Sequence, residues 1–283
     1  MSFDAGLADK VIRLREILEG LQGGAMVAFS GGADSALLAV EAHRVLGSRF
    51  LAVIADSPTL PRAELESALA FGTEHGFAVE VVRTREMENP AFVANDAYRC
   101  YHCKRELFTS MESLARERGM ANLLFGAIAD DAGDWRPGMK AASELGVRAP
   151  LLEAGFTKRD VRARSGELGL ETADKPSSAC LSSRFPQGRP IGLEDLARVE
   201  RAEALLKRLG FTQCRVRLQA DAARIEVEPH ELERAVSGEV RAEIVEGMKA
   251  LGFRFVSLDL EAFRSGSLSA RPSEMNHGIG RNS

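Results

Sequence analysis

The sequence predicts an α/β protein: a doubly wound parallel sheet followed by a smaller C-terminal α+β domain. Apolar runs of strand length alternate with helical segments in the first half of the chain, which is typical of parallel sheets. That alternation stops in a Ser-, Pro- and Gly-rich stretch before residue 190. With 283 residues available, we expect a first domain over 1–190, a second over 191–266 and a disordered, glycine-rich tail over 267–283.

The elements of the first domain follow from its apolar spacing. An amphipathic helix is expected over 8–21, where apolar residues recur at helical intervals. Strands and helices then alternate: strands at 25–29, 50–55, 78–82 and 122–126, and helices at 36–42, 61–75, 104–118 and 158–168. Because parallel strands need a crossover between them, this order predicts a sheet covered by helices on both faces.

The second domain is predicted as a small α+β unit. Its expected elements are a helix at 193–209, strands at 215–218 and 223–228, a helix at 229–251 and a strand at 253–260. A run of two strands, a helix and a strand favours a small sheet covered by helices.

Composition limits the classes of function. Acidic residues near the start and the lack of a long apolar run argue against a secretory signal or a membrane span, so we expect a cytoplasmic protein. A net charge of −4 argues against nucleic-acid binding by bulk electrostatics. Four cysteines in a cytoplasmic chain indicate metal binding, catalysis or core packing rather than a disulfide framework.

The segment Ser30–Ser35, with sequence S-G-G-A-D-S, joins a predicted strand to a predicted helix. Its adjacent glycines let backbone N–H groups turn toward an anion, and the helix adds the positive end of its dipole. The two serines can donate to phosphate oxygens, and Asp34 is suited to coordinate Mg²⁺. A tight turn that uses glycine for steric reasons is the alternative. The predicted ATP-binding residues are Ser30, Gly31, Gly32, Asp34, Ser35 and Asp56.

Further acidic residues follow other strands of the predicted sheet. Asp56 ends the second strand, where open parallel sheets bind ligands, although a helix N-cap is an equal alternative. Asp130, Asp131 and Asp134 follow the strand at 122–126 and can complete a magnesium or substrate site. A mobile acidic loop is the competing interpretation.

Three of the four cysteines are candidates for chemistry. Cys100 and Cys103 form a C-x-x-C pair at the start of a predicted helix, but no second pair completes a zinc site. A three-thiolate iron–sulfur cluster with Cys180 is one interpretation of the pair, and plain packing is the alternative. Cys180 lies in a hydroxyl-rich loop beside Lys175 and Arg184, where positive charge favours the nucleophilic thiolate. Cys214 has no comparable setting.

Two arginines are predicted to share one face of the second domain. Arg215 and Arg217 alternate along a predicted strand, so their side chains leave the strand on the same side. Two guanidinium groups on one face suit a phosphate or carboxylates, and a solvated strand face is the alternative.

The phosphate loop resembles that of the PP-loop, or N-type, ATP pyrophosphatase superfamily, whose fold is adenine nucleotide alpha hydrolase-like. Further motifs together resemble the LarE group of ATP-dependent sulfur transferases: R-C-Y-x-C-K at 99–104, G-A-x-A-D-D-x-G-D-x-R-P-G at 126–138, V-R-A-P-L at 147–151, K-P-x-x-A-C-L-x-S-R-F-P at 175–186 and L-D-L-x-x-F-R-S-G-S at 258–267. Ala129 and Phe263 depart from this pattern, where Asn and Tyr are expected.

This resemblance implies a substrate and a chemistry. ATP would adenylate the carboxylates of pyridinium-3,5-biscarboxylic acid mononucleotide, the precursor of the nickel-pincer cofactor of lactate racemase. The Cys180 thiolate would displace AMP, and elimination would leave dehydroalanine at that position. In a second route, Cys100, Cys103 and Cys180 hold an iron–sulfur cluster that supplies sulfur.

The resemblance also implies binding residues and partners. Ser183, Arg184, Arg215 and Arg217 would bind the phosphate of the substrate. A homo-oligomer, trimer or hexamer, and a downstream nickel-inserting enzyme are further implications. Three other functions compete with this interpretation: a PP-loop tRNA thiolase, an ammonia-using amide-forming ligase and a nucleotide sensor without turnover. The first needs a basic RNA-binding face, and the second leaves Cys180 without a role.

Overall fold

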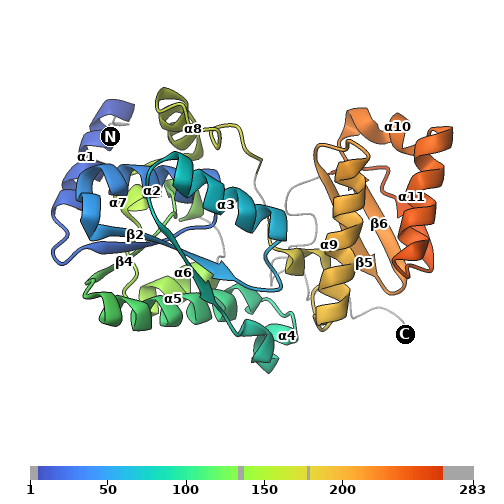
Figure 1. Cartoon of the computed structure of the whole chain (residues 1–283), viewed down its shortest axis with the longest axis horizontal. Coiled ribbons are helices and arrows are strands. Elements are labelled where there is room, and N and C mark those ends of the chain that lie inside the picture. The colour runs from blue at the N-terminus through green and yellow to red at the C-terminus, as the bar shows by residue number, and fades with distance from the viewer. Residues whose placement is uncertain (1–5, 133–136, 177–178, 264–283) are drawn as a thin grey trace, which may run out of the picture. The chain divides into compact units, whose positions relative to one another are not determined.

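The computed structural model describes residues 6–132, 137–176 and 179–263 (Figure 1). The predicted tail over 267–283 and the position of Asp134 therefore lie outside the described residues. Within the described part, the chain divides into two compact units. None of the described helices is both long and apolar enough to cross a membrane.

The first unit is built on a parallel sheet of the order β3-β2-β1-β4. Its strands are β1 (Ala25–Ala28), β2 (Phe50–Asp56), β3 (Val79–Arg83) and β4 (Asn122–Phe125). The strand order reverses beside β1, because β2 and β4 pair with its two edges. The predicted α/β class is thus confirmed, and β1 lies at the point where such sheets open a crevice for ligands.

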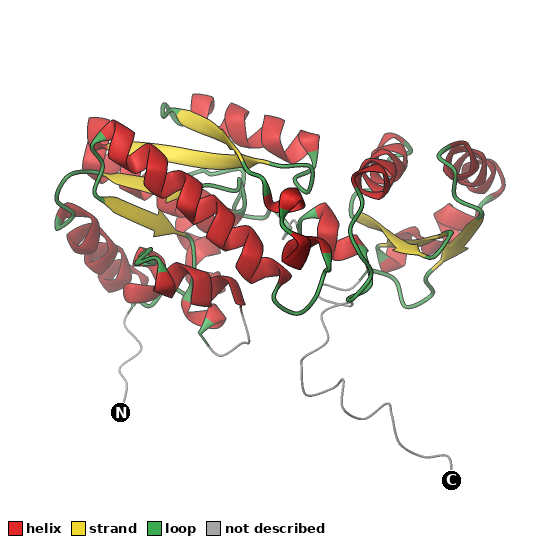
Figure 2. Ribbon diagram, turned by 90° about the horizontal axis from the view of Figure 1, so that it is seen from below, coloured by secondary structure: helices red, strands yellow, loops and turns green. Residues whose placement is uncertain are grey.

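Helices cover both faces of this sheet, as two perpendicular views show (Figure 1 and Figure 2). One face carries α1 (Leu7–Glu19), α2 (Ala33–Leu46), α3 (Arg62–Glu74), α7 (Pro150–Glu153) and α8 (Lys158–Glu167), and the other carries α5 (Arg99–Arg118) and α6 (Pro137–Glu144). The side chains of β1 alternate accordingly. Val27 packs in the first core with Leu14, whereas Met26 packs in the second core with Phe108. The sheet is therefore doubly wound, as predicted.

A buried ion pair fixes α8 against α1. Nζ of Lys10 lies 2.8 Å from Oδ2 of Asp160, and both side chains are less than one-tenth exposed. Burial alone would raise the pKa of Asp160. Hydrogen bonds from Lys10 and from the side chain and backbone of Thr157 outweigh that effect and lower the pKa to about 2. The charged carboxylate is therefore stabilised in the folded chain.

This pair predicts a pH-dependent stability. The pKa of Asp160 in the unfolded chain is about 3.9, so the contribution is complete above that value and is lost as the pH falls toward 2. We expect wild type to lose about 1–2 kcal/mol more unfolding free energy than Asp160→Asn between pH 5 and pH 2, after allowance for solvent screening. Urea denaturation at both pH values measures this difference, and equal losses in the two proteins would contradict it.

The second unit contains a sheet of the order β5-β6-β7. Its elements are α9 (Leu193–Arg208), β5 (Cys214–Gln219), β6 (Ala222–Val227), α10 (Leu232–Val236), α11 (Gly238–Ala250) and β7 (Phe255–Leu258). β5 and β6 pair antiparallel, and β6 and β7 pair parallel. The predicted continuous helix over 229–251 was wrong. Ser237 is extended (ψ 148°), its hydroxyl donates to the carbonyl of Arg234, and a glycine follows it.

The division between the units differs from the expected boundary near 190. The segment Pro90–Ala97, which includes α4 (Pro90–Val93), and the described residues from Ala179 onward belong to the second unit. Asn95 explains the first part, because its side-chain amide donates to the carbonyl of Pro186 and its own carbonyl accepts from Gly188. The loop residues Ala179–Gly188, here called the cysteine loop, thus belong to the second unit, whereas Lys175 and Pro176 belong to the first.

Candidate active site

The phosphate loop Ser30–Ser35 follows β1, and its last three residues form the start of α2. The hydroxyl of Ser35 accepts from the backbone N–H of Ser30 at 3.2 Å, lies 3.0 Å from the hydroxyl of Ser30 and donates to the carbonyl of Gly32 at 3.0 Å. Gly31 has a φ of +68°, a backbone conformation that residues with a side chain rarely adopt. A Cβ at this position would also lie 3.0 Å from Cβ of Ala68. The loop is a closed turn at the N-terminus of a fourteen-residue helix.

Gly126, which follows β4, lets this sheet edge approach the loop. A Cβ on Gly126 would lie 2.8 Å from the backbone nitrogen of Ser35 and 3.0 Å from the carbonyl carbon of Asp34. The obstacle is backbone, which cannot rotate away. From the sequence, Gly126 is expected only as the end of a strand, because a contact between residues so far apart in the chain leaves no local signal.

Gly126→Ala is therefore expected to push the phosphate loop out of position. We expect ATP affinity to fall by about tenfold or more, since a shift of the backbone N–H groups loses hydrogen bonds to a charged ligand. Gly166→Ala is the matched control, because its Cβ would meet nothing within 4 Å inside α8. Calorimetric titration with ATP measures both variants. Equal affinities for them would contradict the role of Gly126.

Two lysines that were not predicted to contact the loop do so in the structure. Nζ of Lys158, at the start of α8, lies 2.8 and 2.9 Å from the two carboxylate oxygens of Asp34. Nζ of Lys175 donates to the carbonyl of Gly31 at 3.0 Å and pairs with Glu64 at 2.8 Å. Two lysines, each paired with a carboxylate, therefore contact the loop from segments more than a hundred residues away.

The other predicted acidic residues have defined partners. The carboxylate of Asp56, at the end of β2, pairs with Arg62 at the start of α3. The carboxylate of Asp130 accepts from the backbone N–H of Lys158 at 2.9 Å. Asp131 accepts from the backbone N–H of Ile128 and closes its own turn. Asp130 and Asp34 thus both contact Lys158, the first through its backbone and the second through its side chain, whereas Asp131 closes a local turn.

Cys100 and Cys103 lie on the first turn of α5. Cys100 is exposed and Cys103 is half-buried, so both thiols reach the surface of the first unit. Residues three apart on a helix share a face. The pair therefore fits the geometry of two neighbouring ligands.

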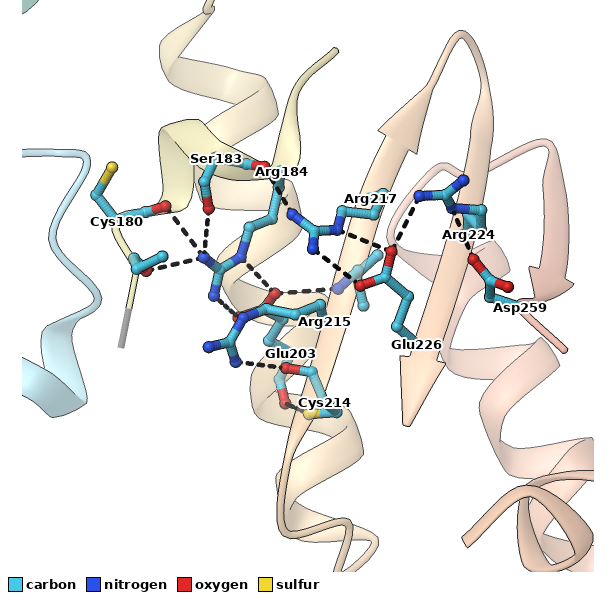
Figure 3. A network of polar contacts seen from close by, with 12 residues as sticks. Cys180, Ser183, Arg184, Glu203, Cys214, Arg215, Arg217, Arg224, Glu226 and Asp259 are labelled. Atoms are coloured by element: carbon cyan, nitrogen blue, oxygen red, sulfur yellow. Dashed lines mark hydrogen bonds and ion pairs between the residues drawn. The ribbon is translucent and has the colours of Figure 1, made fainter. Parts of the chain in front are cut away.

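The cysteine loop is held by a buried arginine (Figure 3). Arg184 is 1% exposed, and its Nε and Nη2 donate to the two carboxylate oxygens of Glu203 at 2.8 and 2.9 Å. Its Nη1 donates to the carbonyls of Ala179 and Cys180 and to the hydroxyl of Ser183. All three guanidinium nitrogens are engaged within the protein, so the structure indicates that Arg184 shapes the loop.

Arg217 and Arg215 lie beside this network on β5 (Figure 3). Arg217 forms a two-point pair with Glu226 at 3.0 and 2.9 Å and donates to the carbonyl of Ser183 at 2.7 Å. Arg215 donates to the carbonyl of Cys214 at 2.8 Å. Burial, followed by the charge of Arg184, lowers the pKa of Arg215. Concentrated positive charge of this kind favours an anion.

The two cysteines of the second unit differ in accessibility. Cys180 is half-buried, and its side chain points away from Arg184 while its carbonyl faces that residue (Figure 3). Cys214 is buried, and burial together with the charge of Glu203 raises the pKa of its thiol to about 12. Cys180 is therefore the thiol of this unit that is suited to react.

The structure thus forms two clusters from the predicted residues. The loop residues and Asp56 lie in the first unit at the carboxyl edge of the parallel sheet, and Cys180, Ser183, Arg184, Arg215 and Arg217 lie together in the second unit. Cys100 and Cys103 belong to the first unit.

A doubly wound parallel sheet whose first strand runs into an S-G-G-x-D-S loop at a helix N-terminus defines an N-type, or PP-loop, ATP pyrophosphatase. The chain is 38% identical over 266 residues to pyridinium-3,5-bisthiocarboxylic acid mononucleotide synthase of Lactiplantibacillus plantarum, covering 94% of this chain and 95% of that protein. The chain belongs to the LarE family of ATP-dependent sulfur transferases.

The chain is also similar to two further proteins, of which the second supports the PP-loop class. An uncharacterized protein of Synechocystis sp. is 44% identical over 93% of this chain and 98% of its own length. One subunit of the glutamine-hydrolyzing GMP synthase of Thermoplasma acidophilum is 30% identical over 57% of this chain and 56% of its own length. No family model matches the chain.

Proposed function

We propose that this chain converts the carboxylates of pyridinium-3,5-biscarboxylic acid mononucleotide into thiocarboxylates at the expense of ATP. The proposal rests on the similarity, over nearly the whole chain, to the pyridinium-3,5-bisthiocarboxylic acid mononucleotide synthase described above. The geometry adds a phosphate loop and an accessible thiol beside buried arginines. Both chemical halves of the reaction thus have candidate residues.

The first half is adenylation. A carboxylate oxygen of the substrate attacks the α-phosphorus of ATP, and pyrophosphate leaves. The backbone N–H groups around Gly31 and Gly32 and the N-terminus of α2 stabilise the negative charge that is transferred to pyrophosphate. Asp34 would hold a magnesium ion, and Asp130 follows β4 at the same carboxyl edge of the sheet.

The second half is sulfur transfer from Cys180. Its thiolate attacks the activated carbonyl carbon, and AMP leaves with the electron pair of the C–O bond. A base then removes the Cα proton of Cys180 while the Cβ–S bond breaks. The products are the thiocarboxylate and a dehydroalanine residue. Arg184 supports this step as a positioning residue, because it holds the carbonyl of Cys180.

An iron–sulfur cluster is the alternative sulfur source. Cys100 and Cys103 fit as two of its ligands, because both thiols reach the surface from one helical turn. Cys180 would be the third ligand. When bound, such a cluster would supply a sulfide in place of the cysteine sulfur. The residues of the chain would bind and adenylate the substrate in the same way.

Ser183, Arg184, Arg215 and Arg217 are the proposed binding residues for the substrate phosphate. Four arginines, Arg184, Arg215, Arg217 and Arg224, gather around the carboxylates of Glu203, Glu226 and Asp259. Among these described side chains positive charge exceeds negative charge by one, which supports a site for an anion. The first unit would then bind ATP and the second the mononucleotide.

Three further proposals follow from the family. The protein acts in the cytoplasm, assembles as a homo-oligomer of three or six copies, and passes its product to a nickel-inserting enzyme. Size-exclusion chromatography with light scattering tests the assembly. A monomer would contradict it.

The activity is tested by offering three acceptors with magnesium and ATP: the pyridinium mononucleotide, xanthosine monophosphate with ammonia, and bulk tRNA. We expect pyrophosphate and AMP with the first acceptor only, together with the thiocarboxylate detected by mass spectrometry. Pyrophosphate release that requires ammonia would favour the amide-forming ligase suggested by the GMP synthase likeness. Release that requires tRNA would favour a tRNA thiolase.

A further inference from the structure

A buried carboxylate joins the segments that follow β2 and β3. Glu86 begins the short 3₁₀ helix Glu86–Glu88 after β3 and is 2% exposed. Its Oε1 accepts a hydrogen bond from the hydroxyl of Ser57, and the hydroxyl of Thr59 lies 3.4 Å from the same oxygen. Ser57 and Thr59 are themselves 4% exposed. Because β2 and β3 pair in parallel, these three buried side chains connect two neighbouring strand ends at the carboxyl edge of the sheet.

No cation compensates this carboxylate within the described part of the chain. No Lys, Arg or His side chain pairs with Glu86 there, and its Oε2 has no hydrogen-bond partner. A buried carboxyl group with an unpaired oxygen normally weakens folding, so such groups are rare in native proteins. What Glu86 does bind therefore indicates why a carboxylate lies at this position.

The carboxylate gives the turn after β2 a defined direction of hydrogen bonding. It accepts and cannot donate, so the proton of the Ser57 hydroxyl points toward Glu86. The Ser57 oxygen then accepts from the hydroxyl of Thr59 at 2.8 Å and from the backbone N–H of Thr59 at 3.0 Å. The N–H of Leu60 donates to the carbonyl of Ser57 at 3.0 Å and closes the turn. Glu86 therefore fixes the conformation of residues 57–60 through one hydroxyl.

This turn is continuous with the proposed ATP site. It follows Asp56 directly, and Arg62 pairs with Asp56 while donating to the carbonyls of Ser57 and Leu60 at 2.7 and 2.9 Å. Strands β1 and β2 are neighbours, about 4.8 Å apart, so a nucleotide with its phosphates in the loop after β1 can reach the end of β2 with its nucleoside. The phosphate loop, in contrast, is closed by its own hydrogen bonds.

We infer that Glu86 is a positioning residue for the nucleoside of ATP, which it controls through the Ser57 hydroxyl without contacting the nucleotide. This role depends on the proposed function only in that ATP binds at the phosphate loop and Asp56, and no sulfur acceptor is involved. Affinity for the base and ribose then depends on the turn after β2, and affinity for the phosphates on the loop after β1. A ligand that contains phosphates alone separates the two.

Calorimetric titrations with magnesium ATP and with inorganic triphosphate and magnesium test this role. The amide of Glu86→Gln can donate to Ser57 and reverse the hydroxyl chain, so the affinity of this variant for ATP should fall by about tenfold. Its affinity for inorganic triphosphate should stay within about twofold of wild type, because this ligand uses only the phosphate loop. Equal losses for the two ligands, or an unchanged affinity for ATP, would overturn the inference.

A second variant, Ser57→Ala, tests the route of the effect. If Glu86 acts through the Ser57 hydroxyl, Ser57→Ala weakens ATP binding to a similar extent, and the double variant binds ATP no more weakly than the single variants. Additive losses would mean that Glu86 acts by another route, and the inference would then be wrong. Thermal unfolding curves of all variants establish that the titrated protein is folded.

Glu88→Gln is the matched control. It removes a carboxylate from an exposed position of the same 3₁₀ helix and should leave the affinity for ATP as in wild type. A loss equal to that of Glu86→Gln would attribute the effect to the general potential and overturn the inference. Wild type that binds triphosphate but not ATP would contradict the proposed function as well. Failure to form the thiocarboxylate contradicts only the proposed function, because no acceptor enters these titrations.

Discussion

Replacing Cys180 with alanine should stop sulfur transfer while ATP binding remains as in wild type. The cysteine route needs the sulfur of Cys180, and the variant has no atom that can attack the activated carbonyl. We expect thiocarboxylate formation to fall by at least about a thousandfold. Single-turnover incubation followed by intact-protein mass spectrometry measures the fate of the sulfur: wild type should lose about 34 Da, one H₂S, and the variant should lose nothing.

Cys214→Ala is the matched control for this experiment. Its thiol is buried and its pKa is raised to about 12, so it cannot replace Cys180 as a nucleophile. The control should still form the product and lose the same mass. If wild type forms product without a mass change, the cluster route is favoured, and Cys100→Ala and Cys103→Ala should then fail. Thiocarboxylate formation by Cys180→Ala at the wild-type rate would exclude both routes.

Glu203→Gln should strongly destabilise the second unit. The carboxylate of Glu203 accepts from two nitrogens of Arg184 and from the backbone N–H of Val216. Without the carboxylate charge, the guanidinium group of Arg184 remains buried beside neutral hydrogen-bond acceptors only, with no negative charge to compensate its own. We expect the free energy of unfolding to fall by about 3–5 kcal/mol, the usual cost of breaking a buried pair from one side.

Glu194→Gln is the control variant for the loss of the buried Glu203–Arg184 ion pair. Glu194 is exposed in the first turn of the same helix α9, so its loss removes only a weak interaction with the helix dipole, about 0.3–1 kcal/mol. Urea denaturation monitored by amide exchange in the second unit measures both variants. Similar losses of stability would show that Arg184 does not depend on Glu203.

The sequence predicted the sheet and the phosphate loop because both depend on local patterns. Alternating apolar runs determine strands and helices, and the two glycines of the loop mark their own turn. Lys158 and Gly126 were not predicted, because each meets the loop through contacts between distant parts of the chain. The break at Ser237 was missed although its Ser-Gly pair is a local turn signal, because the apolar spacing continues on both sides.

The unit to which the cysteine loop belongs was also not predicted, because it depends on contacts between distant parts of the chain. Its Ser-, Pro- and Gly-rich composition predicts a loop, and a loop has no hydrophobic periodicity that would indicate which domain it packs against. The buried pair of Arg184 with Glu203 decides this, and it links residues that lie on different elements.

The segment Pro90–Ala97 belongs to the second unit although it lies within the sequence of the first. Neither unit is therefore encoded by one continuous stretch of the chain. A fragment cut from Ala179 onward would lack Asn95 and Val93, whose backbone carbonyls accept from Gly188 and Ile191. The complementary fragment would carry that segment without its hydrogen-bonding partners. Separate expression of the two units therefore requires a rearranged chain, either circularly permuted or with Pro90–Ala97 grafted onto the second unit. Simple truncation would yield two incomplete fragments.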